Sequence, residues 1–468
     1  MFFLLMRLYD IGSMNLRGFL GYFMGKFIKS TYLYIWFIVV VALLMMCLMW
    51  SVYLIPVEKI RENTHQSVET LLKTKAYHKS YWKRVIRNEV DAATDARMLN
   101  EAGFVGLSED DFLLNPRIHY VDAPSFSLYH SMNNTDWEKK YVKLLPVFLY
   151  QNIHARQKEG EWIDLYPRFW HGYLLFLKPL LVFFDLQGIR YINLVVQLGL
   201  LFVILYLMYK RLGFGHCVAF GGAMCFINPV TSWMCLEYAN VVNVMLLATL
   251  WVLLNKNSDD NYMFFVIGVI TILFDFLTFP LVTLGIPLIL YLCLYKRGFK
   301  KDIRCVVKNS LLWLIGYAGM WFSKWGLATL FTDYNVIKDG WENVLHRTYG
   351  ITENGDVLSD VTMLHSILSN FEIIWNRNTV VILGVALVLI LVSCICSFYV
   401  LKIKYQLRMH LKAFVLLCIG LMPFVWYSVL VNHSVVHAYL FTHKIFAVSV
   451  YAILSAFVCS LCEVKNEK

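Results

Sequence analysis

Two aspartates four residues apart, Asp91 and Asp95, are the side chains of this sequence best suited to acid–base chemistry. Segment 80–100 has the apolar spacing of an amphipathic helix, which places both carboxylates on one helix face. Like charges at this spacing repel by roughly 0.2–0.5 kcal/mol unless a cation, a proton or a substrate lies between them. The pattern equally fits a solvated helix in which Arg87 neutralises Asp91, so both interpretations stay open.

Two basic residues, Arg168 and His171, precede an apolar stretch, 174–184, that is too short to span a membrane. We predict a helix resting at the membrane interface, with Trp170 and Tyr173 among its aromatic anchors. Arg168 and His171 then lie at the depth of the lipid headgroups, where an anionic phosphate can meet them. Interfacial arginines and aromatic residues also occur without such a site, which is the alternative.

Three further ionisable residues fall within or beside apolar segments, where an ionised group is costly and indicates a functional role. Asp275 is predicted close to the outer membrane surface, and Glu237 lies in another outer turn. Lys324 falls in the outer third of its helix. A lysine there suits a phosphate contact, although its long chain can also extend to the surface.

A histidine-rich segment near the C-terminus contains His433 and His437, with Lys444 deeper in the following apolar run. The spacing of the two histidines permits one helix face. We favour phosphate binding over metal binding, because two histidines with no acidic ligand nearby in sequence are a weak metal signal. Hydrogen bonds between helices are the third alternative. No metal-binding residues are predicted, and the need for a divalent metal is left open.

The composition excludes a soluble fold. Of 468 residues, 59% are hydrophobic and 16% are charged, whereas soluble domains carry about 25% charged residues. The net charge is +10, but Lys and Arg cluster at the ends of apolar segments, which indicates membrane topology and no nucleic-acid partner. None of the eleven cysteines falls within 56–165, so a disulfide framework there is excluded, and no Cys/His spacing suggests zinc.

Ten apolar segments approach the length of roughly twenty residues that a spanning helix needs. They lie near 32–55, 187–209, 214–230, 234–254, 261–277, 279–295, 309–331, 378–401, 412–431 and 437–461. The expected fold is an all-α polytopic membrane protein with about ten transmembrane helices. A large first extracytoplasmic loop carries interfacial amphipathic helices. The segments 214–230, 261–277 and 279–295 are short or closely spaced, and half-helices are the alternative there.

The basic clusters predict the orientation, because they all fall on one side, which the positive-inside rule makes cytoplasmic. The predicted parts are a cytoplasmic N-terminus 1–31 with translation starting at Met1 or Met14, a first span 32–55, an extracytoplasmic loop 56–186, the remaining spans 187–461 with an outer loop 332–377, and a cytoplasmic tail 462–468. This topology collects the candidate residues on the outer side.

The layout resembles the membrane-embedded glycosyltransferases of the GT-C fold, which use sugars carried on polyprenyl phosphate or pyrophosphate. The shared features are a first helix after a cytoplasmic N-terminus and a long first outer loop with interfacial helices and an acidic residue. The stretches Asp91-Ala-Ala-Thr-Asp, Tyr166-Pro-Arg-Phe-Trp-His-Gly-Tyr, Phe274-Asp-Phe-Leu-Thr-Phe-Pro and Asn432-His-Ser-Val-Val-His look like those of uncharacterised bacterial membrane proteins linked to surface polysaccharide synthesis.

In that fold family the first-loop carboxylate is the general base for the acceptor hydroxyl, and inversion at the anomeric carbon is usual. The resemblance therefore implies Asp91 or Asp95 as the base, without a choice between them. The adjacent Asp-Glu pair of several members is absent from 80–103. Charge and depth suggest phosphate contacts for Arg168, Lys324, His437 and Lys444.

The expected function is an inverting glycosyltransferase on the outer face of a bacterial cytoplasmic membrane. It would move a sugar from a polyprenyl-phosphate donor to a surface glycan or lipid acceptor, with membrane lipids as further partners and no cofactor assigned. The alternatives are a transporter or flippase of lipid-linked glycans, and a polymerase. Against a transporter, the sequence shows no inverted repeat and no polar residues at the bilayer midplane. Against a polymerase, the large loop comes first in this chain, whereas polymerases usually place it late.

Overall fold

The structure is a computed structural model. It describes residues 16–55, parts of 60–71, 77–79, 89–102, 117–119, 156–158, 161–165, 168–256, 262–295, 297–331, 335–350, 361–375, 377–401, 404–407 and 411–464. Both predicted start sites, Arg87, part of the outer loop 332–377 and the last residues of the tail lie outside these ranges.

The first part of the chain combines helices with short antiparallel strands. Its elements are α2 (Leu16–Tyr53), β1 (Tyr77–Lys79), β2 (Glu89–Asp91), α4 (Ala92–Ala102), β3 (Arg117–His119), β4 (Arg156–Lys158), β5 (Glu161–Leu165) and α8 (Leu174–Leu181). β1 pairs with β2, placing Tyr77 opposite Asp91, and β5 lies between β3 and β4.

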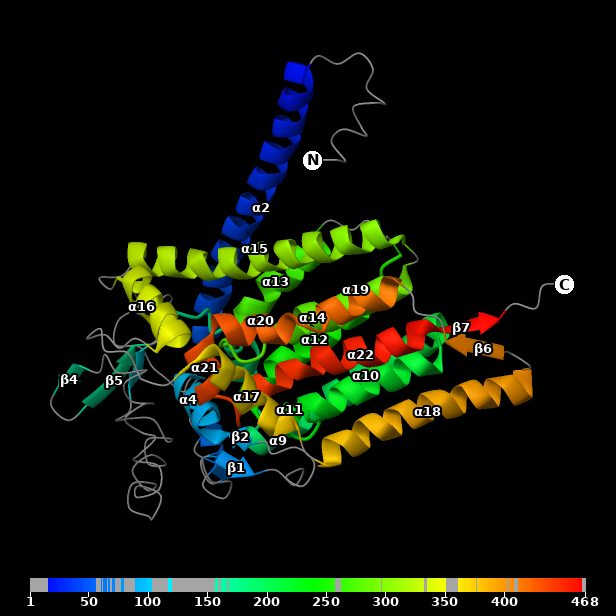
Figure 1. The fold of residues 1–468 in the computed structure, drawn as a ribbon. Helices are drawn as coiled ribbons and strands as arrows, with labels where there is room; N and C mark the ends of the chain where they lie inside the picture. The colour runs from blue at the N-terminus through cyan, green and yellow to red at the C-terminus, as the bar shows by residue number, and fades with distance from the viewer. Residues whose placement is uncertain are drawn as a thin grey trace.

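The rest of the chain is a bundle of helices (Figure 1). Its elements are α9 (Leu186–Leu212), α10 (Phe214–Ile227), α11 (Thr231–Met234), α12 (Leu236–Leu254), α13 (Met263–Phe274), α14 (Leu281–Leu294), α15 (Phe299–Phe331), α16 (Val336–Tyr349), α17 (Met363–Ile374), α18 (Arg377–Leu401), β6 (Lys404–Leu407), α19 (Leu411–Ile419), α20 (Met422–Val429), α21 (Val431–Val436), η2 (Thr442–Phe446), α22 (Ala447–Ser460) and β7 (Leu461–Val464). The strands β6 and β7 pair antiparallel.

Among the described residues, five helical stretches are long and apolar enough to cross a membrane. They are Tyr32–Val52, Leu186–Leu212, Leu236–Leu254, Leu411–Val429 and Thr442–Ser460. Shorter apolar helices cover Phe214–Ile227, Met263–Phe274, Leu281–Leu294 and Val381–Ser393. A mostly helical, membrane-type fold is therefore confirmed, and each predicted span overlaps at least one helix. The count of ten spans and their sidedness stay predictions.

The helix α22 lies in the middle of the packing and contacts α10, α14 and α19. The pair α13 and α15 is held at close range by two glycines. A Cβ atom added at Gly268 would meet the carbonyl oxygen of Trp313, and one added at Gly316 would meet that of Phe265. Because each glycine faces the other helix's backbone, neither position has room for a side chain.

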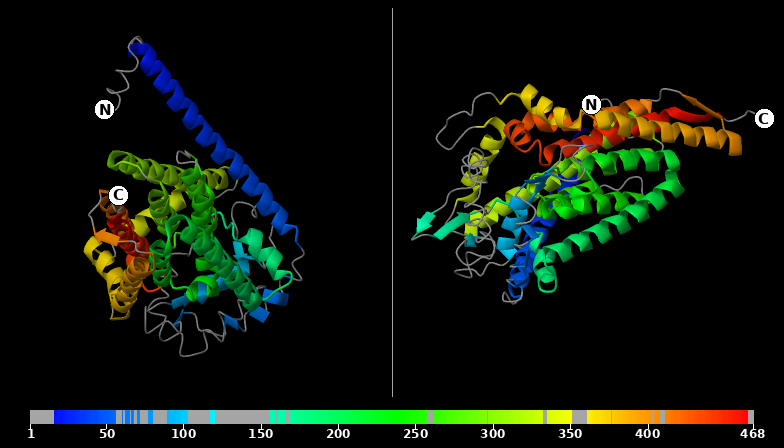
Figure 2. Two further views of the ribbon diagram at one scale, coloured as in Figure 1. Left: turned by 90° about the vertical axis from the view of Figure 1, so that its right-hand side faces the viewer. Right: turned by 90° about the horizontal axis from the view of Figure 1, so that it is seen from below.

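The helix α2 crosses the bundle at a steep angle and projects beyond it (Figures 1 and 2). It contacts α15 and α8, and its Tyr34 ring lies 4.6 Å from the Phe265 ring of α13. That α2 crosses the membrane beside the other spans therefore stays a prediction.

The predicted helix 80–100 is partly wrong, because residues 89–91 form strand β2 and the helix begins only at Ala92. Asp91 lies at the N-terminal boundary of α4, where a short acceptor side chain satisfies free backbone N–H groups better than a helix interior position would. The short helix predicted in 174–184 is present as α8. Asn63 donates to the carbonyl of Leu181 at 2.6 Å and ties the preceding segment to α8.

Candidate functional site

The candidate residues gather mainly at one end of the bundle, the left end in Figure 1. There α4, α16, α21 and the turn between α13 and α14 approach one another, opposite the end that carries β6 and β7 (Figures 1 and 2). The helix α16 packs on α15 and α21, and α4 packs on α12. These contacts join segments that are far apart in sequence.

Asp91 is engaged by the start of its own helix. Its Oδ1 accepts from the backbone N–H of Thr94 at 2.9 Å, and its Oδ2 accepts from the Thr94 hydroxyl at 2.9 Å. This is the geometry of a helix N-cap. Asp91 therefore stabilises α4 as well as facing the acidic group described below.

Asp95 is buried and paired with a cation that the sequence analysis missed. Its Oδ2 lies 3.2 Å from Nη2 of Arg190 in α9, and its Oδ1 accepts from the backbone N–H of Leu236 at 2.8 Å. Burial raises the pKa of Asp95 to about 6, while Arg190 acts in the opposite direction. Because both oxygens are occupied, Asp95 holds α4 against α9 and α12.

Asp275 closes the turn after α13. Its carboxylate accepts from the backbone N–H groups of Leu277 (3.0 Å) and Thr278 (2.9 Å), from the Thr278 hydroxyl (2.6 Å) and from the Tyr317 hydroxyl (3.0 Å). Leu277 has a φ of 65°, a conformation that is costly for a residue with a branched side chain. Four donors make Asp275 the stabiliser of this strained turn.

Glu237, in the first turn of α12, is buried and lies among the other carboxylates. It interacts electrostatically with Asp91, Asp95, Asp275 and Arg347. Among the described residues, no hydrogen-bond donor reaches its Oε2. Glu237 is therefore the carboxylate of this group with an oxygen that no described donor occupies.

His433 orients a second missed residue, Arg347 of α16. Its Nδ1 lies 3.0 Å from Nη1 of Arg347, and its Nε2 lies 2.7 Å from the carbonyl oxygen of Leu277. A guanidinium only donates and a carbonyl only accepts, so Nδ1 is unprotonated and Nε2 carries the hydrogen. In agreement, burial and then Arg347 hold the pKa of His433 well below its usual value. His433 is a neutral positioning residue for Arg347.

His437 lies next to His433, with ring centroids 4.7 Å apart, and stacks on Phe441 at 4.8 Å. Within the described part of the chain its Nδ1 is buried and has no hydrogen-bond partner. The predicted spacing of the two histidines therefore does bring their rings together. Aromatic packing accounts for their position, and His437 keeps one nitrogen for a ligand.

Arg168 is buried and neutralised, whereas the sequence placed it among headgroups. Its Nη1 lies 2.8 and 2.9 Å from the two carboxylate oxygens of Asp339 in α16. Its carbonyl oxygen accepts from the indoles of Trp321 and Trp325, at 2.9 and 3.1 Å. The arginine therefore fastens the segment before α8 to α15 and α16.

A missed carboxylate, Glu101 at the end of α4, lies near two of the predicted cations, His171 and Lys324, and near Lys178, which was not predicted. His171 Nδ1 lies 3.0 Å from its Oε2, which also accepts from the Tyr173 hydroxyl. Lys178 and Lys324 interact with it electrostatically. Burial lowers the pKa of Lys178 to about 7, and Glu101 opposes this shift. Three basic side chains therefore surround one acid, an arrangement with surplus positive charge when the bases are protonated.

Contacts between aromatic rings connect the basic residues around Glu101 with the carboxylates around Glu237. Arg347 lies over the ring of Phe169 at 5.9 Å, and Phe169 contacts Phe276 at 5.5 Å. The His171 ring lies 5.4 Å from Phe276 as well. The turn that contains Asp275 and Phe276 thus lies between the carboxylates around Glu237 and the basic residues around Glu101.

Lys444 lies against the start of α12 and is held by hydrogen bonds to the end of α10 and to α11. Its Nζ donates to the carbonyl oxygen of Ile227 at 2.8 Å and to the Thr231 hydroxyl at 3.0 Å, and it lies over the Tyr238 ring at 4.9 Å. These contacts satisfy the last turn of α10, which ends at Asn228 with a φ of 66°. The structure does not bring Lys444 to the cationic group around Glu101.

Some of the missed residues carried a signal in the sequence. Arg190 and Lys178 both stand in apolar stretches, where an ionisable residue indicates a partner. Glu101, Asp339 and Arg347 lie in polar segments whose charges look solvated, and only helix packing shows their partners.

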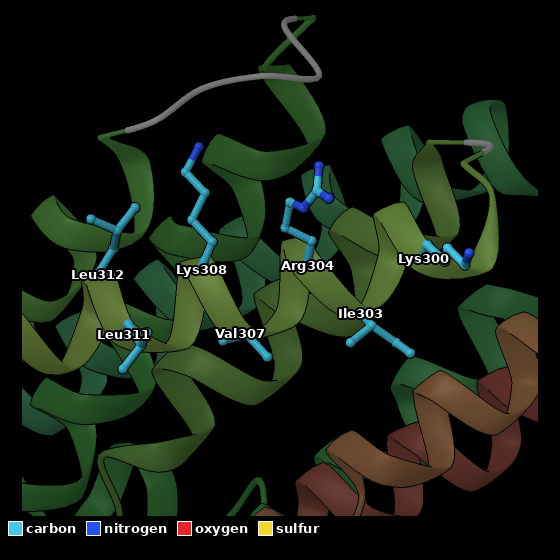
Figure 3. A pocket seen from close by; sticks show the side chains of 7 residues that line it. All are labelled: Lys300, Ile303, Arg304, Val307, Lys308, Leu311 and Leu312. Atoms are coloured by element: carbon cyan, nitrogen blue, oxygen red, sulfur yellow. The ribbon is translucent and has the colours of Figure 1, made fainter. Parts of the chain in front are cut away.

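A separate groove lies on the first half of α15 (Figure 3). Its volume is about 540 Å³, and its lining residues are Lys300, Ile303, Arg304, Val307, Lys308, Leu311 and Leu312. Arg304 and Lys308 point to one side of the helix and Ile303 to the other (Figure 3). The groove shares no residue with the carboxylate and histidine groups.

No protein-family model matches this chain, and neither a curated protein nor a solved structure shows significant similarity to it. The function is therefore argued from the site.

Proposed function

We propose that this protein is an inverting glycosyltransferase that moves a sugar from a polyprenyl-phosphate donor to a hydroxyl of a surface glycan or lipid. The observation that carries the proposal is the position of Glu237. A buried carboxylate oxygen without a hydrogen-bond donor among the described residues belongs to a side chain that interacts electrostatically with Arg347. Such a pairing supports proton abstraction on one side and phosphate stabilisation on the other.

Glu237 is the preferred general base in this proposal. The first-loop aspartates remain the alternative, but Asp95 is engaged by Arg190 and Leu236, and Asp91 caps α4. A base must have an oxygen that can reach the acceptor hydroxyl. In this assignment Asp91 and Asp95 position α4 beside Glu237.

The phosphate of the donor binds, in this proposal, at the basic groups near Phe169. Arg347 is oriented by His433, and Lys178, Lys324 and His171 surround Glu101. A guanidinium and ammonium groups in a buried setting stabilise negative charge more strongly than they would in water.

The reaction transfers one proton and exchanges one bond. The acceptor hydroxyl gives its proton to Glu237 while its oxygen forms a bond to the anomeric carbon. The bond from that carbon to the phosphate oxygen breaks, and its electron pair leaves with the phosphate. Attack from the face opposite the phosphate inverts the anomeric configuration.

The test is turnover of labelled polyprenyl-phosphate sugars by the purified full-length protein in detergent, followed as release of the lipid phosphate. We expect Glu237→Gln to lower turnover by about 100-fold or more, the usual loss when a general base is removed. Asp302→Asn, a carboxylate near the start of α15, is the matched control and should retain activity.

Two outcomes contradict parts of the proposal. If Glu237→Gln is active and the Asp91→Asn/Asp95→Asn double variant is inactive although folded, the base lies in α4 or at its start. If no donor releases its phosphate, the enzymatic assignment is wrong. Movement of an intact lipid-linked glycan across vesicles would then support the flippase alternative.

A further inference from the structure

Three potential metal ligands meet at the other end of the bundle. His216 lies in the first turn of α10, Cys293 lies at the end of α14, and Cys459 lies at the end of α22. One ligand atom from each lies within 4.8 Å of the other two, and the two sulfur atoms are 3.9 Å apart. Residues so far apart in sequence form no recognisable motif, so only the packing of the three helices shows the group.

The distances match a tetrahedral zinc site. With zinc–sulfur bonds of about 2.3 Å, two ligands at a tetrahedral angle are about 3.8 Å apart. The observed separation of the sulfur atoms of Cys293 and Cys459 is 3.9 Å. A disulfide would require the sulfur atoms to approach to about 2.05 Å and would leave His216 without a role.

The surroundings support a ligand at this position. His216 is buried, and among the described residues its Nδ1 has no hydrogen-bond partner. The Lys412 ammonium interacts electrostatically with both sulfur atoms. Lys412 also donates to the carbonyl oxygens of Leu292 and Tyr295 at 2.9 Å each. A buried imidazole facing two thiols beside a fixed cation favours thiolate ligation.

We propose that His216, Cys293 and Cys459 bind one Zn²⁺ ion, with water in the fourth position, and so tie together the ends of α10, α14 and α22. Binding releases the two thiol protons, and the resulting thiolates neutralise the charge of the metal. In the predicted topology this end faces the cytoplasm, where thiols stay reduced. The proposal is independent of the glycosyltransferase assignment.

The test measures the metal content of the full-length protein, purified under reducing conditions, incubated with ZnCl₂ and dialysed. We expect about one zinc per chain by mass spectrometry of the metal, and about a tenfold loss in Cys293→Ser/Cys459→Ser. Cys418→Ser, an exposed cysteine of α19, is the matched control and should retain the zinc.

Cobalt exchange gives a second readout on the unchanged protein. Co²⁺ bound by two thiolates produces a sulfur-to-metal charge-transfer band in the near ultraviolet, and this band should be absent after His216→Ala/Cys459→Ser. Wild-type protein without zinc and without this band would overturn the proposal. Zinc retained by the Cys293→Ser/Cys459→Ser variant, or a Cys293–Cys459 disulfide in freshly purified protein, would overturn it too.

Discussion

The buried pair of Asp95 and Arg190 makes the sharpest prediction about stability. In Arg190→Met, the Asp95 carboxylate keeps the Leu236 N–H but loses its cation, and it stays fully buried. Removing one partner of a buried ion pair costs about 3–5 kcal/mol. With an unfolding entropy of about 2 cal/mol/K per residue, a loss of 1 kcal/mol in the free energy of unfolding lowers Tm by about 1 °C in a chain of this length. We therefore expect Tm to fall by about 3–5 °C at pH 8.

The pH dependence of this loss follows from the same pair. The pKa of Asp95 is raised to about 6 from 3.8, chiefly by burial. A carboxyl group with a raised folded-state pKa contributes stability that is fully present below about pH 4 and is lost as pH rises toward 6, about 3 kcal/mol in all. Without Arg190 the pKa rises further, so the window of loss extends to higher pH. The variant should be closer to wild type at pH 5 than at pH 8.

The assay is thermal unfolding in detergent at both pH values, monitored by circular dichroism. Lys210→Met, which removes an exposed cation from the same helix, is the control and should change Tm by less than about 0.5 °C. Arg190→Met/Asp95→Asn should recover part of the loss, because no uncompensated charge remains. An Arg190→Met variant within 1 °C of wild type at pH 8, or with equal losses at both pH values, would refute the reasoning.

Two further substitutions separate packing from ligand binding. Gly268→Ala should force α13 and α15 apart at Trp313 and lower the free energy of unfolding by about 1–3 kcal/mol. Gly326→Ala, which faces open space inside α15, should raise it by about 0.5–1 kcal/mol in the same melts, because alanine favours the helix over glycine. Lys444→Met should lower Tm, because the carbonyl oxygen of Ile227 loses the hydrogen bond from Lys444. The apparent affinity for a polyprenyl-phosphate sugar should stay within about twofold of wild type. A large rise in KM at unchanged Tm would place Lys444 in the binding site.

The membrane-type helical fold was predictable because it depends on local properties. Long apolar runs such as 187–209 cannot satisfy their backbone groups in a bilayer except as helices, and α9 covers that run. The amphipathic pattern did not predict that α4 begins at Ala92. Asp91 and Thr94 nevertheless have the spacing of an N-cap, a local signal that outweighs periodicity at a helix end.

The site could be predicted in part. Asp91, Asp95, Glu237 and Asp275 were found from their positions, and the structure brings them into electrostatic contact. Their individual roles were not visible, because a carboxylate's role depends on which donors occupy its oxygens. Asp275 receives donors from the turn after it and from α15, while Glu237 has an oxygen that no described donor reaches.

The sequence by itself determined the membrane character, the helical segments and the residues that are costly to bury, since all three depend on residue type and local spacing. Only the tertiary structure decided the partners: Arg190 for Asp95, Asp339 for Arg168, Glu101 for His171, and the meeting of His216 with Cys293 and Cys459. The physical reason is that a charge or a thiol acts over a few ångströms, and in a helical bundle such distances are set by packing between helices far apart in the chain.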